Sequence, residues 1–166
     1  MTICPLLQRN YNTMQPKRFL KILATIHLAL CVGLVLCAVF AFYQNGDFTA
    51  RMNQQDIFIY IVPIVAAAGY FLSQLVFKKR IESISRKENL SIKLRKHQIT
   101  SLIKYALLEG PGFLALTAYF WSGNALYLII AIALIVYLFV QRPTAEKIKK
   151  ELPLTLEEQK QFDNLK

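Results

Sequence analysis

The hydrophobic residues of this chain lie in four long blocks that hold almost no charge, unlike the short alternating patterns of a soluble domain. The blocks cover residues 20–43, 57–77, 102–121 and 125–141. A bilayer core about 30 Å thick needs about 20 mostly apolar helical residues to cross it. Hydrocarbon offers no partner to backbone N–H and C=O groups, so a closed helix is the natural way to span it. Each block is therefore predicted to be a membrane-spanning helix.

The predicted fold is all-α, a polytopic membrane protein whose four helices form two hairpins. Asn45-Gly46-Asp47 is a turn signal inside the first hairpin, and Ser122-Gly123-Asn124 is a tight turn inside the second. A basic connector over residues 78–104 joins the hairpins. On this reading residues 1–143 form the transmembrane domain and residues 144–166 a short helical tail.

Two capping-box spacings predict helices outside the apolar blocks. Ser85-x-x-Glu88 predicts that the third helix starts well outside the membrane, so that the connector protrudes as a helical hairpin. Thr144 is expected to cap a short helix that ends before Pro153, and Thr155-x-x-Glu158 to open a last one. In the third helix one face would then carry Ile92, Ile99, Ile103, Ala106 and Gly110.

The charge of +10 over 166 residues is placed unevenly along the chain. Bases dominate residues 1–21 and 78–104, whereas the loop at 44–56 and the turn at 122–124 hold almost none. Basic residues gather beside cytoplasmic loops, so both termini and the connector are predicted to be cytoplasmic, in a cell inner membrane. Nucleic-acid binding is not expected, because the basic stretch lacks interleaved aromatic residues and the motifs of known readers.

Glu109 is the first candidate for chemistry, because it is the only acid inside a predicted span. Ionisable groups at membrane depth are costly and often belong to ion or proton pathways. Gly110-Pro111-Gly112 follows, and Pro111 has no N–H for the carbonyl of Leu107, so we expect the helix to kink or break there. The alternative is a structural acceptor, bonded to Tyr105, His27 or Ser73, or an acid that reaches the interface.

Small residues recur every four positions in the first two spans. The first carries Ala29, Gly33, Cys37 and Ala41, and the second carries Gly69 and Ser73. Small residues let membrane helices approach closely, so this pattern predicts the seam of the first hairpin or, instead, an oligomer face.

The connector forms a candidate basic patch of Arg86, Lys87, Lys93, Arg95 and Lys96. These bases either only set the topology or also bind anionic lipid or an acidic protein surface. No metal or cofactor is predicted, because the sequence has no metal-ligand cluster, phosphate loop, nucleophile elbow or HExxH. His27 is expected to bond a neighbouring helix.

The run KYALLEGPGFLALTAYFWSGN followed by QRPTAEKIKKEL resembles a pattern of small four-helix bacterial inner-membrane proteins without an assigned function, over about a third of the chain. A looser similarity is to the four-helix proteolipids of rotary ATPase rings, which pair two hairpins and carry one buried carboxylate, here Glu109. Those helices are rich in Gly and Ala, whereas this chain has only 6 Gly.

The sequence thus predicts a non-enzymatic subunit or scaffold of a membrane assembly, with other membrane subunits or further copies of itself as partners. The alternative is a small transporter or a proton- or cation-conducting subunit that uses Glu109.

Overall fold

The computed structural model describes residues 15–46, 48–50 and 56–163, and in this part of the chain it is entirely helical apart from connections and one isolated β-bridge. The all-α prediction is confirmed. The helices are α1 (Pro16–Asn45), α2 (Phe58–Glu82), α3 (Leu90–Ser122), α4 (Ala125–Val140), α5 (Ala145–Glu151) and α6 (Leu156–Asp163).

Three of these helices, α1, α2 and α3, are long and apolar enough to cross a membrane. The 16 residues of α4 reach only about 24 Å at about 1.5 Å per residue, which is short of a bilayer core. The chain bends by 83° between α4 and α5, and this pair counts as a fourth candidate span only if the two helices are taken together. The protein is therefore a helical membrane protein with three or four candidate spans.

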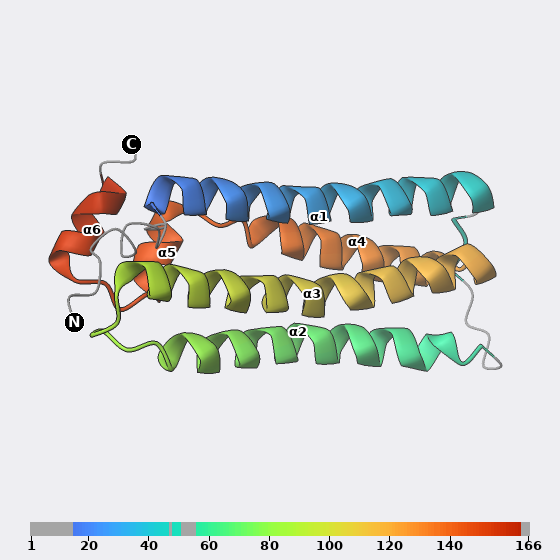
Figure 1. Cartoon of the computed structure of the whole chain (residues 1–166). Helices are drawn as coiled ribbons and strands as arrows, with labels where there is room; N and C mark the ends of the chain where they lie inside the picture. Colours follow the sequence, from blue (N-terminus) through green and yellow to red (C-terminus); the bar gives the residue numbers. More distant parts are fainter. Residues whose placement is uncertain (1–14, 47, 51–55, 164–166) are drawn as a thin grey trace, which may run out of the picture.

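The long helix α3 occupies the centre of the bundle, and α1 and α2 lie on opposite sides of it (Figure 1). It packs against α1, α2 and α4, whereas α1 and α2 hardly touch each other in the described part of the chain. The predicted seam between the first two spans is therefore wrong. A short loop puts two helices next to each other in sequence, but side-chain packing decides which helices pair.

The small residues of α1 do not form a close helix contact. Ala29 and Cys37 are exposed, and a Cβ on Gly33 would meet nothing within 4 Å. Only Ala41 is buried. The face of α1 that packs inward carries larger side chains, namely Phe19, Leu23, His27, Cys31, Leu34 and Ala41.

Gly69 of α2 makes the closest backbone approach in the bundle, and it does so against α3. A Cβ at this position would lie 2.6 Å from the Leu107 carbonyl oxygen and 2.6 Å from Cγ of Pro111. Ser73, one turn further along α2, is also buried, and its hydroxyl donates to the carbonyl of Tyr70 at 2.7 Å. The small residues of α2 were thus correctly expected at a helix contact, but the helix they meet is α3.

The expected break at Gly110-Pro111-Gly112 is also wrong, because α3 runs without interruption from Leu90 to Ser122. Proline removes one backbone hydrogen bond, that to the Leu107 carbonyl. Membrane helices tolerate this loss where a neighbouring helix covers the site. Here α2 covers it through Gly69, and Pro111 and Gly112 are both buried in the packed seam.

One end of the bundle, which we call the basic end, consists of residues 78–96 together with α5 and α6 (Figure 1). The predicted helical extensions are confirmed, since α2 runs on to Glu82 and α3 begins at Leu90. The expected capping box is wrong, because the N-cap of α3 is Asn89 without a side-chain cap, and Glu88 instead closes the preceding turn by accepting from the Ser85 amide at 3.3 Å. Thr144 accepts from the Lys147 amide and caps α5, as predicted.

The last helix is held by a complete capping box. The Thr155 amide donates to Glu158 at 2.7 Å, and the Glu158 amide donates to the Thr155 hydroxyl at 3.3 Å, as the spacing predicted. Because α5 turns by 83° from the axis of α4, the two short helices lie across the basic end instead of extending the bundle.

The opposite end is closed by polar contacts between connections. The Asn45 side-chain amide donates to the carbonyls of Tyr119 and Phe120 at 2.9 and 3.0 Å, and the Tyr127 hydroxyl donates to Asp56 at 2.6 Å. Both α1 and α3 end here at glycines with positive φ, Gly46 and Gly123, which end a helix without the strain that a side chain would bring.

Candidate functional site

The buried face of α3 is polar where the helix enters the basic end. Lys93, His97, Ser101 and Lys104 follow one another at spacings of four, four and three, so they form one stripe along the helix. All four are buried, with exposed fractions of 0%, 2%, 3% and 7%. We call this set the α3 polar stripe. Three of its side chains are bonded by groups that follow α4 in the sequence.

Lys93 is the most deeply buried member of the stripe. Its ammonium donates to both carboxylate oxygens of Glu158 in α6, at 3.1 and 2.8 Å. Burial by itself would raise the pKa of the Glu158 carboxyl, but hydrogen bonds from Lys93 and from the Thr155 amide outweigh it and hold the pKa below its usual value. This pair fastens α6 to α3.

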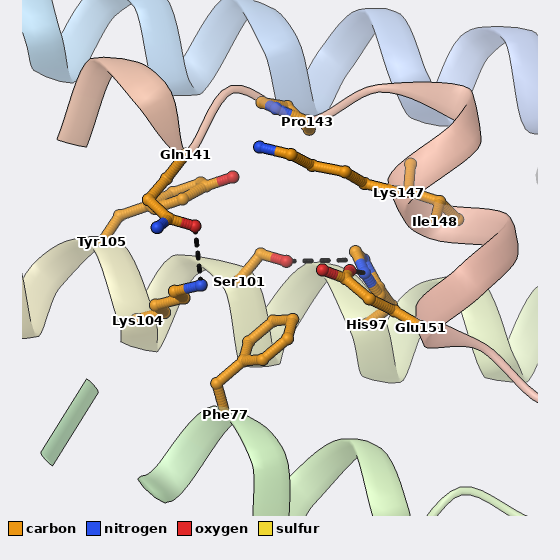
Figure 2. Close-up of a pocket in the computed structure, with 10 residues that line it drawn as sticks. All are labelled: Phe77, His97, Ser101, Lys104, Tyr105, Gln141, Pro143, Lys147, Ile148 and Glu151. Carbon is orange, nitrogen blue, oxygen red and sulfur yellow. Dashed lines mark hydrogen bonds and ion pairs between the residues drawn. The ribbon is translucent and has the colours of Figure 1, made fainter. Parts of the chain in front are cut away.

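His97 lies one turn further along and fastens α5. Its Nε2 is 2.7 Å from Oε2 of Glu151, and its Nδ1 is 3.4 Å from the Ser101 hydroxyl (Figure 2). A neutral ring with its proton on Nε2 satisfies both partners, donating to the carboxylate and accepting from the hydroxyl. The rings of Phe19 and Phe77 contact the imidazole edge to face from two sides, which fixes its orientation.

Lys104 completes the stripe at the level where α4 ends. Its ammonium donates to the Gln141 side-chain oxygen at 2.9 Å and lies 4.4 Å from the centre of the Phe77 ring (Figure 2). Nearby, the ammonium of Lys147 donates to the carbonyls of Val140 and Arg142. These carbonyls form the negative end of α4, so the lysine stabilises the sharp turn from α4 into α5.

Three members of the stripe, His97, Ser101 and Lys104, line a cavity of about 20 Å³. It is lined by Phe77, His97, Ser101, Lys104, Tyr105, Gln141, Pro143, Lys147, Ile148 and Glu151 (Figure 2). A cavity of this size holds about one water molecule. Ser101, His97 and Glu151 lie in the order of a hydroxyl, a base and a carboxylate along the wall of this cavity. The arrangement can hold a water and pass a proton along hydrogen bonds.

Glu109 lies outside this cluster and is half-buried. None of the hydrogen bonds among the described residues includes its carboxylate, so the predicted bonds to Tyr105, His27 or Ser73 are wrong. The carboxylate instead lies close enough to Cys31 of α1 for the two groups to interact electrostatically. Tyr105 instead lines the cavity.

His27 bonds a neighbouring helix, as the sequence predicted. Its Nε2 donates to the carbonyl of Leu138 in α4 at 2.8 Å, and its ring meets that of Tyr105 edge to face at 4.9 Å. Cys31 Sγ lies 3.9 Å from the same nitrogen. Together these groups form a small polar cluster that joins α1, α3 and α4. In the described part of the chain no three potential ligands among His, Cys, Asp and Glu gather as a metal site.

The predicted basic patch loses one member. Lys93 is buried and bound to Glu158, because the stripe faces α6 and not the solvent. Arg86, Lys87, Arg95 and Lys96 are exposed. Lys96 donates to Glu88 at 2.7 Å, and this hydrogen bond holds the pKa of the Glu88 carboxyl below its usual value.

The α3 polar stripe was missed from the sequence, although a signal for it exists. Ile92, Ile99 and Ala106 share the opposite face of the helix and are exposed, so the polar side is the one that packs inward. In a soluble helix this pattern would point the isoleucines to the core. Beside a bilayer apolar side chains meet lipid, so the shared face of these residues does not by itself decide which side of the helix packs inward.

No family model, no curated protein and no solved structure matches the chain in the comparisons made with each.

Proposed function

We propose that the protein is a non-enzymatic subunit or scaffold of a membrane assembly, with a rigid cap formed by the connector, α5 and α6 as its docking platform. The observation that carries this proposal is that the buried polar groups of α3 are occupied by the chain's own tail. Lys93 binds Glu158, His97 binds Glu151, and Lys104 binds Gln141. Groups used in this way hold a surface in place and are not free to act on a substrate.

The proposal includes a topology of four crossings of an inner membrane, with both termini and the connector in the cytoplasm. The uneven distribution of bases supports it, because the basic end holds the connector and the two tail helices together. In a variant without native cysteines, Ala50→Cys and Ser122→Cys should react with an impermeant maleimide in intact cells. Arg86→Cys and Gln161→Cys should react only after the cells are opened. All four of these positions are exposed, so protection reports the membrane and not burial in the protein.

The assembly itself is tested by affinity purification from native membranes in mild detergent. We expect a defined set of membrane proteins, or further copies of this chain, to be recovered with the wild type. Glu158→Ala should lose that set, because it releases α6 from Lys93. Glu157→Ala removes the same charge from the neighbouring exposed position and should keep it. Recovery that is equal for both variants, or an absence of stoichiometric partners for the wild type, contradicts the platform.

A second candidate function is proton or cation handling by Glu109. The observation in its favour is a half-buried carboxylate in a candidate span without a hydrogen-bond partner among the described residues. Such a group is costly at membrane depth unless it has a use. If it carries ions, Glu109→Gln should impair growth of a complemented deletion strain across pH and sodium as severely as Glu109→Ala. Both variants should still insert. If both variants support normal growth and the wild type does not react with a carbodiimide, this candidate is excluded.

A further inference from the structure

The basic end contains a second pocket, between the last turn of α2 and the first turns of α3. It has a volume of about 220 Å³ and is lined by Arg80, Ser83, Lys96, Ile99 and Thr100. It is separate from the cavity of the α3 polar stripe, with which it shares no residue. We refer to it as the α2–α3 pocket.

The α2–α3 pocket is cationic. Arg80 is exposed, and none of the ion pairs among the described residues includes its guanidinium. Lys96 is 46% exposed and shares its ammonium with Glu88. The other nearby acid, Glu82, is exposed and outside the pocket lining. A planar guanidinium beside an ammonium is the arrangement that proteins use for phosphate groups.

The hydroxyl groups of the pocket add acceptors instead of donors. Ser83 donates its proton to the Arg80 carbonyl, and Thr100 donates to the Lys96 carbonyl, at 2.7 and 2.8 Å. Their oxygen lone pairs remain available to a ligand that carries donors. The lining therefore fits a phosphate that carries a hydroxyl-containing substituent. The two cations bind the phosphate, and the two hydroxyl oxygens accept from the substituent.

The apolar side of the pocket leads toward the spans. Ile99 lines the pocket and is 45% exposed. By helical spacing the same side continues through Ile103 on α3, and on α2 through Val76 and Leu72. Leu72 is itself 48% exposed. A charged pocket beside exposed apolar side chains of α2 and α3 is amphipathic in the same direction as a lipid at the membrane surface.

We propose that the α2–α3 pocket binds the phosphate-bearing headgroup of an anionic phospholipid, whose acyl chains lie against the exposed apolar side chains that follow Ile99 on α3 and Leu72 on α2. The recognised chemistry is the phosphate group, which a soluble phosphate shares. The apolar side of the pocket favours the lipid, because the exposed Ile99 offers nothing to a free phosphate, and the volume of about 220 Å³ is enough for a headgroup.

The test is native mass spectrometry of the purified full chain in detergent, where no charged bilayer surface adds unspecific attraction. Phosphatidylglycerol is titrated against phosphatidylcholine, and inorganic phosphate and glycerol 3-phosphate form separate arms. We expect one phosphatidylglycerol to bind at least about tenfold more tightly than phosphatidylcholine. Neither soluble phosphate should displace it at millimolar concentration. Arg80→Gln with Lys96→Gln should weaken binding about tenfold or more, since both charge-assisted contacts to the phosphate are lost.

The matched control is Arg86→Gln with Lys87→Gln, which removes the same charge from exposed positions outside the pocket. It should change binding less than about threefold. Ile99→Trp fills the pocket without a change of charge and should weaken binding to the extent that the double charge variant does. Thermal midpoints of all variants show that each is folded. Equal losses in both charge pairs, full displacement by a soluble phosphate, or tighter binding of an acidic peptide would each overturn the proposal.

Discussion

The helices α1 and α3 are both long enough to cross a membrane, but their roles in the bundle are opposite. The most apolar stretch of α1 is more hydrophobic than that of α3, yet only 22% of it is buried inside the protein, against 44% for α3. In water the more apolar helix would be the core. In lipid the apolar side chains of α1 lose nothing by facing outward, whereas the polar side chains of α3 need protein partners. The least apolar of the three long helices therefore lies at the centre.

The largest expected effect comes from breaking the buried ion pair of α3. Glu158→Ala leaves the Lys93 ammonium buried without a partner, which costs about 3–5 kcal/mol for a buried pair. We expect α6 to leave the bundle, seen as loss of amide hydrogen-exchange protection in α6 and a lower thermal midpoint. Glu157→Ala is the matched control in the same helix.

The same pair can be removed from both sides. Lys93→Met combined with Glu158→Leu replaces the two charges by apolar groups and should recover most of the lost stability. If Glu158→Ala lowers the thermal midpoint and the exchange protection of α6 no more than Glu157→Ala does, the α3 polar stripe does not hold the tail.

A smaller effect is expected where α2 touches α3. Gly69→Ala places a Cβ against the Leu107 backbone oxygen and the Pro111 ring, so one helix must shift, at a cost of about 1–3 kcal/mol. Gly33→Ala in α1 meets nothing within 4 Å and should be neutral or stabilising by up to about 1 kcal/mol through helix propensity. Thermal unfolding in detergent measures both. If both substitutions changed the stability in the same direction, the difference in packing between α1 and α2 at these two glycines would be contradicted.

Acid should weaken the docking of the tail, to a smaller extent than the Glu158→Ala substitution. The pKa of Glu158 in the folded protein lies below its usual value of 4.5, so the folded state favours the ionised carboxylate. Its contribution is fully present above pH about 4.5 and is lost as the pH falls through the lowered pKa. The protection factor of the α6 amides, which is corrected for the intrinsic pH dependence of exchange, should therefore fall below this pH in the wild type. In the double Met and Leu variant the protection factor should not change over that range.

The smallest effect is expected on the outer face of α1. Leu36 is 63% exposed, and Leu36→Ala should change the thermal midpoint in lipid very little, because lipid replaces the lost contacts. Leu34, fully buried on the opposite face, provides the contrast, since Leu34→Ala opens a cavity beside Gly112. A clear loss for Leu36→Ala, together with a change in oligomeric state, would show that this face of α1 binds protein and not lipid.

The sequence by itself determined the helical class, the apolar stretches and most helix ends. Thr144 and the pair Thr155 and Glu158 cap their helices as predicted, because caps depend on contacts within one turn. His27 bonding a neighbouring helix was also predicted, since a single imidazole among apolar residues needs a partner wherever the helix packs.

The tertiary structure alone decided which helices pair and which polar groups meet. Gly69 packs on α3 and not on α1, and α2 supports Pro111, where the isolated helix was expected to break. Lys93 and Glu158 are distant in sequence and join only because the chain turns by 83° between α4 and α5 and brings the tail back to α3. The physical reason is that a local sequence pattern indicates whether a residue needs polar or apolar surroundings. It does not indicate which distant residue provides the contact.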